Sequence, residues 1–314
     1  MTPRRFPSVS VGVSLAALAP CACQKEPGTG HVVEAGPVTR PPGPVSAADA
    51  ARYVLALVNH DRAEAGLPAV EWDDTAAKGG AVHAADMALH GYTAHWGTDG
   101  TVPEERYTDA GGTDFVEENA ACFFDGVTRP LDPSASFDPV ELEKIEAAFM
   151  AEVPPNDGHK KNILGKAHRL LGVGVAQPLG IGQPCMAQEF VDDYGDYDDL
   201  PRRSKVGGSV RVRGTIAEPA KFGAVGIARI DPARPMSAEE LNHTHTYPIP
   251  APYVLFTPKG FVTPKPVDVN GNQFSIEIPL SDGGKPGRYE ISVWATLPGD
   301  KSLVTVSQRV VDVR

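Results

Sequence analysis

The chain has 314 residues, of which 41% are hydrophobic and 22% are charged, and its formal net charge is −11. This length is sufficient for two ordinary domains, and the near-average composition excludes a disordered chain. The acidic balance excludes nucleic acid as a partner, because binding to phosphate requires a basic surface.

Residues 1–23 are predicted to be an export signal. Arg4 and Arg5 precede an apolar stretch over residues 9–19, which is too short to span a bilayer. The following Leu-Ala-Pro-Cys resembles a bacterial lipoprotein signal, with Cys21 as the lipidated residue and Pro20 as a departure from the usual small residue. The alternative is an ordinary secretory signal. Residues 24–45, rich in Pro and Gly, are predicted to be a flexible tether.

Two helices are predicted at the start of the first domain. Ser46 and Asp49 form a capping signal, apolar residues then recur at helical spacing, and Gly66 ends the first helix. A second helix begins at Asp73 or Asp74 and runs to about residue 89. His83 and His90 share one face of it. They are either metal ligands or partly exposed residues of an amphipathic helix, and the weakness of so short a motif favours the second reading.

Three further side chains are candidates for a polar site. His95 lies in a loop marked by Gly and Asp-Gly, where functional residues are common. Strand alternation over residues 115–124 places Glu118 on an apolar face, and helical periodicity over residues 138–152 does the same for Glu152. Burial of unpaired carboxylates is costly, so these two glutamates indicate a shared polar partner such as histidines or a metal.

Cys122 and Cys185 are predicted to form a disulfide. Residues 169–176 and 186–191 are expected to be strands, and the two cysteines belong to the strands of an exported protein, where thiols normally pair. Such a bond would close a loop of roughly sixty residues and contribute roughly 4 kcal/mol by chain-entropy arguments.

Five segments of the first domain occur in an order seen in one family. They are Asn59-His60-Asp61-Arg62, His95 with Asp99-Gly100, Glu118-Asn119-Ala120, Glu152, and Gly158-His159-Lys160-Lys161-Asn162-Ile163-Leu164. With these segments the chain resembles the CAP superfamily, which includes cysteine-rich secretory proteins, antigen 5 and pathogenesis-related 1 proteins and whose module is also called the SCP domain. The last segment, which follows Pro154-Pro155, is the most specific. The departures are Ala94, Glu117 and Phe149, where Ser, Gly and Trp are usual.

The resemblance implies an α+β fold over residues 46–194, a three-layer α-β-α sandwich with a central cavity. Carried over residue by residue, that cavity would be lined by His95, Glu118, Glu152 and His159. The two imidazoles, His95 and His159, could bind Zn²⁺ or another divalent metal and leave positions for water. The glutamates could orient the histidines or accept a proton from that water.

A second domain is expected over residues 209–314, after a linker over residues 195–208. Short alternating runs separated by Pro and Gly turns predict an all-β sandwich of immunoglobulin-like type. The acidic run over residues 192–199 could bind calcium, but it lacks the spacing of a calcium loop, which favours a solvated segment. His243 and His245 could coordinate a metal together. No third ligand is nearby, however, so a polar loop is favoured.

Three functions compete for this chain. The resemblance favours an exported, extracellular or cell-envelope binding module without turnover. Its cavity would take a divalent metal or a small or lipidic ligand, with a lipid, glycan or protein as the extracellular partner. A structural or adhesive surface protein ranks second. A metal-dependent hydrolase ranks third. A serine nucleophile is disfavoured, because no Ser occurs between Ser46 and Ser134.

Overall fold

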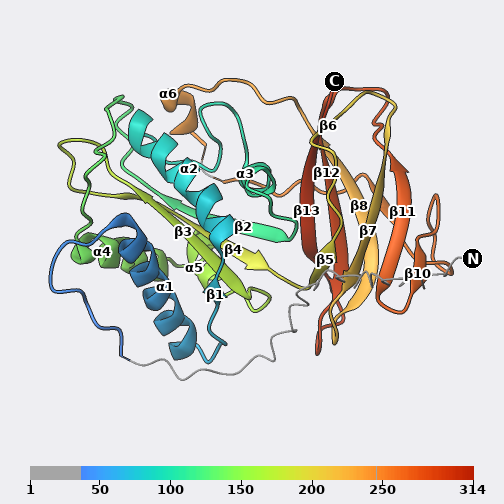
Figure 1. Cartoon of the computed structure of the whole chain (residues 1–314), viewed down its shortest axis with the longest axis horizontal. Helices are drawn as coiled ribbons and strands as arrows, with labels where there is room; N and C mark the ends of the chain where they lie inside the picture. The colour runs from blue at the N-terminus through green and yellow to red at the C-terminus, as the bar shows by residue number, and fades with distance from the viewer. Residues whose placement is uncertain (1–36, 245) are drawn as a thin grey trace, which may run out of the picture.

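The computed structural model describes residues 37–244 and 246–314, and it divides into two packed units (Figure 1). The N-terminal unit, residues 37–193, is built from helices around one sheet. The C-terminal unit, residues 194–314, is built mainly from two sheets. The predicted signal over residues 1–23, the lipidation at Cys21 and most of the tether lie outside the described residues, as does His245. Within the described part, no helix is both long and apolar enough to cross a membrane.

Local signals set the ends of the helices in the N-terminal unit. The Ser46 side chain accepts a hydrogen bond from the backbone N–H of Asp49, and Asp73 accepts one from that of Ala76. Gly91, with φ of 66°, ends the second helix in the left-handed conformation that glycine adopts without strain. The helices are α1 (Ala47–Glu64), α2 (Asp74–His90), α3 (Pro103–Asp109), α4 (Pro139–Met150) and α5 (Gly158–Ile163).

The sheet of the N-terminal unit has the order β1-β3-β4-β2, so β2 lies at one edge. β3 and β2 each pair antiparallel with β4, whereas the short β1 pairs parallel with β3. This position of β2 matters for the site, because side chains from both faces of the sheet can meet around an edge strand. The strands are β1 (Glu71–Trp72), β2 (Phe115–Ala121), β3 (Leu170–Ala176) and β4 (Cys185–Asp192).

Helices cover both faces of this sheet (Figure 1). On one face, α2 lies directly on Gly172 and Gly174. A Cβ atom at these positions would fall 2.0 Å from the backbone N of Ala77 and 2.1 Å from that of Ala81. Since strand residues alternate in direction, Leu171 and Val173 face the other way, into a core shared with α1 and α4. The predicted mixed α and β composition is confirmed.

The predicted disulfide is confirmed as well. Cys122 and Cys185 are bonded, and both are buried. The bond links the end of β2 to the start of β4 and closes a segment with a sequence separation of 63 residues. It therefore fixes the edge strand to its neighbour at the end of the sheet near α2's last turn, where Met87 and Ala88 share its core cluster.

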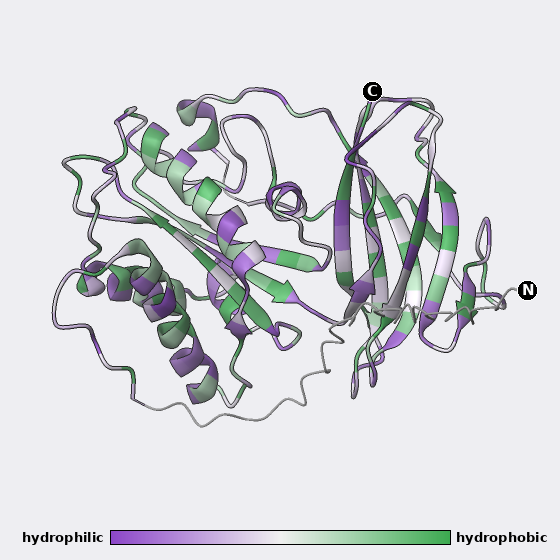
Figure 2. Ribbon diagram, viewed as in Figure 1, coloured by the Kyte–Doolittle hydropathy of each residue, from purple (hydrophilic) through white to green (hydrophobic). Residues whose placement is uncertain are grey.

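The C-terminal unit consists of two sheets, ordered β10-β11-β7-β5 and β6-β13-β12-β8-β9. Buried and exposed residues alternate along β7 and β11, and the hydropathy of the ribbons shows the same alternation (Figure 2). The buried residues of both sheets form one core. The strands are β5 (Gly195–Tyr197), β6 (Arg203–Ser204), β7 (Ser209–Ile216), β8 (Lys221–Ile230), β9 (Val254–Phe256), β10 (Asp268–Asn270), β11 (Gln273–Pro279), β12 (Gly287–Thr296) and β13 (Leu303–Val313).

The C-terminal unit begins earlier than the sequence indicated. The range expected to be a linker, 195–208, contains β5 and β6, and β5 pairs with β7. Tyr194 and Tyr197 belong to the core of this unit. The acidic residues around these tyrosines favoured the interpretation as a solvated linker. The two aromatic side chains nevertheless point into the core, and Tyr197 belongs to β5.

One long connection of the C-terminal unit reaches the N-terminal unit. Residues 231–253, here called the strap, join β8 to β9 and contain α6 (Ala238–Leu241). In Figure 1 the strap leaves the sandwich and places α6 beside α2. The backbone N–H of Met236 donates to the carbonyl of Thr98 at 2.8 Å, so the strap is hydrogen-bonded to the loop that carries His95.

A buried arginine joins the units at a second place. Arg288 on β12 donates to the carbonyl of Gly100 at 2.7 Å and to the Glu105 carboxylate at 2.8 Å. The Arg288 side chain is 8% exposed. A charged hydrogen bond in such a dry position is lost if the units separate, so the two units are expected to hold a defined orientation.

Candidate functional site

A cavity of about 760 Å³ lies where the edge strand β2, the loop after α2, residues 152–162 and the strap come together. All four residues that the family resemblance assigned to a cavity, His95, Glu118, Glu152 and His159, line it. They form two separate pairs, each an imidazole with a carboxylate. The remaining wall residues include Val116, Asn119, Pro155, Lys161, Tyr247 and Ile249.

The first pair joins the His95 loop to β2. Nδ1 of His95 lies 2.9 Å from Oε1 of Glu118, whose other oxygen accepts a hydrogen bond from Arg106 at 2.7 Å. Burial by itself raises the pKa of Glu118, but His83 in its protonated form, the charge of Arg106 and the hydrogen bond from His95 lower it by more. Glu118 is therefore ionised at neutral pH, and its carboxylate holds the His95 ring in place.

Arg106 on α3 is a residue of the site that the sequence did not indicate. Besides Glu118, it donates to the carbonyl oxygens of His95 and Thr101, so it fixes both the carboxylate and the loop. No periodic signal marks it, because α3 is only seven residues long. Its one sequence cue is its position shortly after the His-containing loop.

His83 lies behind this pair and is completely buried, in contrast to the partly exposed position expected from the sequence. Its Nε2 atom lies 2.7 Å from the carbonyl oxygen of Ala94 and 3.6 Å from Glu118. Burial, and then the charge of Arg106, lower the pKa of His83 to about 4. His83 is therefore neutral at pH 7 and donates to the His95 loop, while His90 lies near Asp86 instead.

The second pair is local in sequence. Oε1 of Glu152 lies 2.5 Å from Nδ1 of His159, and Oε2 accepts the backbone N–H of His159 at 2.9 Å. The His159 ring stacks on Phe149 with 4.3 Å between the ring centroids. The expected position of Glu152 on the apolar stripe of a helix is wrong, because α4 ends at Met150 and Glu152 is half-buried beyond it.

A chain of amides connects the second pair to the sheet. Asn119 on β2 donates to the carbonyl of His159 at 3.2 Å and to the side chain of Gln188 at 3.0 Å. Asn162 donates to Asn119 at 3.1 Å and contacts His168 at 2.9 Å. Since Glu118 and Asn119 are consecutive, their side chains leave β2 on opposite faces. The two imidazole–carboxylate pairs thus reach the cavity around both sides of the edge strand.

The Asn-x-x-Arg motif of α1 is structural. Asn59 exchanges two hydrogen bonds with the backbone of Val70. Arg62 is fully buried and donates to the carbonyls of Pro68, Ile163 and Gly165. The carbonyls of Ile163 and Gly165 lie at the end of the motif that begins at Gly158. Arg62 therefore fixes the segment that carries His159 without lining the cavity itself.

The tautomers of the two cavity histidines follow from these contacts. Each Nδ1 faces a carboxylate oxygen, which accepts a hydrogen bond, so the proton lies on Nδ1 and Nε2 keeps its lone pair. This is the arrangement in which a carboxylate orients an imidazole for metal or ligand binding. Across residues 37–244 and 246–314, no cluster of three or more His, Cys, Asp or Glu side chains is arranged to hold a metal ion.

Two other metal candidates from the sequence are engaged in local contacts. In the acidic run, Asp192 accepts from His168 at 2.7 Å and Asp198 accepts from Arg213 at 2.6 Å. His243 follows α6 in a turn, and its Nδ1 lies 2.6 Å from the carbonyl oxygen of Glu239. It lies outside the strands.

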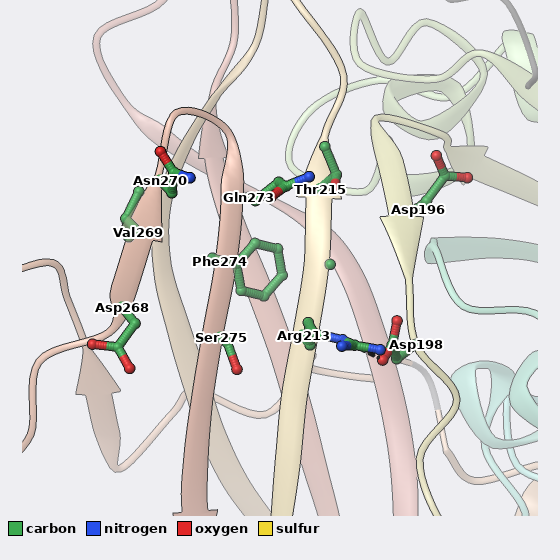
Figure 3. A pocket seen from close by; sticks show the side chains of 11 residues that line it. Asp196, Asp198, Arg213, Thr215, Asp268, Val269, Asn270, Gln273, Phe274 and Ser275 are labelled. Carbon is green, nitrogen blue, oxygen red and sulfur yellow. Dashed lines mark hydrogen bonds and ion pairs between the residues drawn. The ribbon is translucent and has the colours of Figure 1, made fainter.

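A separate depression of about 500 Å³ lies on the outer sheet of the C-terminal unit (Figure 3). It runs across β10, β11, β7 and β5, and Arg213 within it is paired with Asp198. In Figure 3 its acidic side chains are spread over the sheet, with Asp268 and Asp196 at opposite sides. It contains no histidine, and its groups do not converge as those of the cavity do.

Comparisons with known proteins agree with the motifs. Residues 55–178 match the family model of the Cysteine-rich secretory protein family, CAP. No curated protein matches the chain. Two solved structures show partial similarity. An extracellular protein containing an SCP domain from Bacillus anthracis str. Ames is 24% identical, with a TM-score of 0.35 over 46% of this chain and 41% of that chain. A chitin binding domain from Burkholderia pseudomallei is 10% identical, with a TM-score of 0.23 over 37% of this chain and 57% of that chain.

Both structural matches span less than two thirds of the other chain. The family match is independent of them and covers His95, Glu118, Glu152 and His159. The resemblance of the N-terminal unit to the CAP family of cysteine-rich secretory proteins is therefore confirmed over residues 55–178.

Proposed function

We propose that this protein is an exported binding module whose CAP cavity takes a divalent metal or a small or lipidic ligand through the Nε2 atoms of His95 and His159. One observation carries the proposal. Both imidazoles are held by a carboxylate on Nδ1, and both line the same cavity. A binding site needs such fixed acceptor atoms, because a preorganised group loses little freedom when the ligand arrives.

The donor set is compatible with a divalent metal of the zinc type. Neutral imidazole nitrogen is a usual ligand of Zn²⁺, and a carboxylate on the second ring nitrogen is its usual support. Here His95 and His159 would be the protein ligands, and Glu118 and Glu152 would support them. A metal held by two residues leaves coordination positions for water or for an oxygen-bearing ligand, so it would serve binding directly.

Export is part of the proposal. The Cys122–Cys185 disulfide supports a location outside the cytoplasm, where such bonds persist. The signal over residues 1–23 predicts the same location, with Cys21 as the anchor if the signal is of lipoprotein type. We also infer that the N-terminal unit is the three-layer sandwich of its family and that the C-terminal unit is immunoglobulin-like. The helices on both faces of one sheet and the two-sheet core support these assignments.

The test is zinc titration by calorimetry on residues 37–314. The wild-type protein is compared with the double variant His95→Ala/His159→Ala and with a matched control, His90→Ala/His243→Ala, which removes two histidines outside the cavity. We expect saturable binding in the wild type and control and its loss in the cavity variant. Equal binding in all three proteins would contradict a cavity site. Absence of binding in all three would favour the four residues as a structural hydrogen-bond network.

A further inference from the structure

The strap attaches to the N-terminal unit beside the cavity. Oδ1 of Asn242, just after α6, accepts the backbone N–H of Thr93 at 3.0 Å. Its amide nitrogen lies 3.3 Å from the carbonyls of Gly91 and Phe124. Together with the bond from Met236 to Thr98, these contacts hold the strap along the loop that contains His95.

Tyr247 brings the strap to the cavity itself. Its ring is perpendicular to that of Trp96, with 4.9 Å between centroids, and its centroid is 6.5 Å from that of His95. Its hydroxyl donates to the carboxylate of Glu104 on α3. Tyr247 and Ile249 both line the cavity, although they belong to a connection of the C-terminal unit.

The anchor of Tyr247 is buried and involves both units. Glu104 from the N-terminal unit and Glu290 from β12 are 3% and 1% exposed. Burial raises the pKa of both groups, and the charge of Glu104 raises that of Glu290 further. One group is therefore neutral and can share its proton with the other. The hydroxyl of Tyr247 is thus held by a dry carboxyl pair rather than by solvent, which restricts movement of the ring.

We propose that the ligand site is composite, with Tyr247 of the C-terminal unit as its specificity-determining residue. This inference rests on the proposed function. The imidazoles and the β2 edge supply the polar end of the site, and the strap supplies an aromatic and aliphatic wall through Tyr247 and Ile249. The arrangement suits a ligand with a polar head at the histidines and a flat or apolar part against the strap. It excludes ligands too bulky to pass Tyr247.

Acylation of His95 tests this wall without any knowledge of the ligand. Two reagents of the same chemistry and different size, diethyl pyrocarbonate and di-tert-butyl dicarbonate, are applied to residues 37–314, and modification is located by peptide mass spectrometry. In the wild type we expect His95 to react with the small reagent and to be protected from the bulky one. In Tyr247→Ala the bulky reagent should modify His95 several-fold faster, while the reaction at His90, which lies outside the cavity, serves as an internal reference.

Two further variants separate removal of the wall from general disruption. Tyr247→Phe keeps the ring and should retain protection. Tyr253→Ala removes an exposed tyrosine whose hydroxyl bonds to Ser281, and should also behave as the wild type. Unchanged selectivity at His95 in Tyr247→Ala, together with a wild-type unfolding curve, would overturn the proposal. A rise at His95 and at the fully buried His83 alike would show loss of folding and also contradict a specific wall.

Zinc titration of Tyr247→Ala distinguishes this inference from the proposed function. The variant keeps both imidazoles, so zinc binding should persist while size selectivity is lost. If zinc fails to bind the wild type but the acylation result is as expected, the role of Tyr247 is supported and the metal part of the proposed function is contradicted. If zinc binds and size selectivity is unchanged in Tyr247→Ala, the proposed metal site in the cavity is supported and the role of Tyr247 is contradicted.

Discussion

Glu118 on β2 and Glu189 on β4 lie directly opposite each other in the sheet register, on the face covered by α2. Both residues are buried, and of these two carboxyl groups it is that of Glu118 to which Arg106 donates. Burial and the charge of Glu118 raise the pKa of Glu189 well above its usual range. The buried pair therefore carries one negative charge at neutral pH, with the proton on Glu189.

A neutral replacement of Glu189 should consequently be tolerated. We expect Glu189→Gln to change the free energy of unfolding at pH 7 by less than about 1 kcal/mol, because the amide has the shape and charge of the protonated acid. Glu189→Ala should cost about 2–3 kcal/mol, because it leaves a cavity beneath α2. Urea denaturation of both variants gives the comparison. A Glu189→Gln protein as unstable as Glu189→Ala would show that Glu189 is ionised in the folded state.

Arg62 should be essential for stability rather than for binding. Arg62→Ala leaves the buried carbonyls of Ile163 and Gly165 without their donors, so we expect a loss of about 3–5 kcal/mol. Arg62→Lys should rescue little, because one ammonium group does not reproduce the forked guanidinium. Arg52→Ala is the matched control on the same helix. The Arg52 guanidinium stacks on Trp72 at the surface, and its removal should cost below about 1 kcal/mol. Similar losses in the two alanine variants would contradict this assignment.

The carboxyl pair between the units should make stability depend on pH. Burial, and then the proximity of Glu104, raise the pKa of Glu290 to about 10, from an ordinary value of 4.5. A raised pKa means that the folded state keeps a proton that the unfolded state releases. Its stabilising effect is full below about pH 4.5 and is lost progressively as the pH rises toward 10. The slope from one such group is at most about 1.4 kcal/mol per pH unit.

Glu290→Gln should therefore flatten the decline of stability between pH 5 and pH 9, as measured by thermal or urea unfolding across this range. Glu146 on α4, whose pKa burial raises to about 8, contributes a decline of the same sign and should be unaffected. The matched control is Glu277→Gln, at an exposed position of β11. A Glu290→Gln profile parallel to that of the wild type would show that the pair is not protonated in the folded protein.

Local sequence signals predicted the elements well. The caps at Ser46 and Asp73, the strand around Glu118, and the cysteine pair depend on neighbours in sequence or on residue type, and the structure contains them. The pairing of Glu152 with His159 could also be predicted from the sequence, because the two residues are only seven positions apart. The family motifs selected the same residues. Periodicity failed at Glu152 because the helix stops at Met150, so the carboxylate turns toward the next segment.

Contacts between distant segments escaped sequence reasoning. His83 has the pattern of an amphipathic-helix residue, and only the packing of α2 against β4 shows that it is buried. Tyr247 lies more than a hundred residues from His95, in a stretch whose composition resembles a loop. Arg288 likewise has no local feature that marks it as a link to Gly100. Such contacts depend on how the two units pack, which no pattern within either unit encodes.

The position of the strap also bears on evolution. The family match ends at residue 178, whereas Tyr247 and Ile249 lie well beyond it. The imidazole–carboxylate pairs and the opposing wall can thus diverge under separate selection. A lineage could exchange its C-terminal unit, keep every family motif and acquire a new ligand. Among relatives that match over residues 55–178, we therefore expect ligand preference to follow the C-terminal unit more closely than the shared motifs.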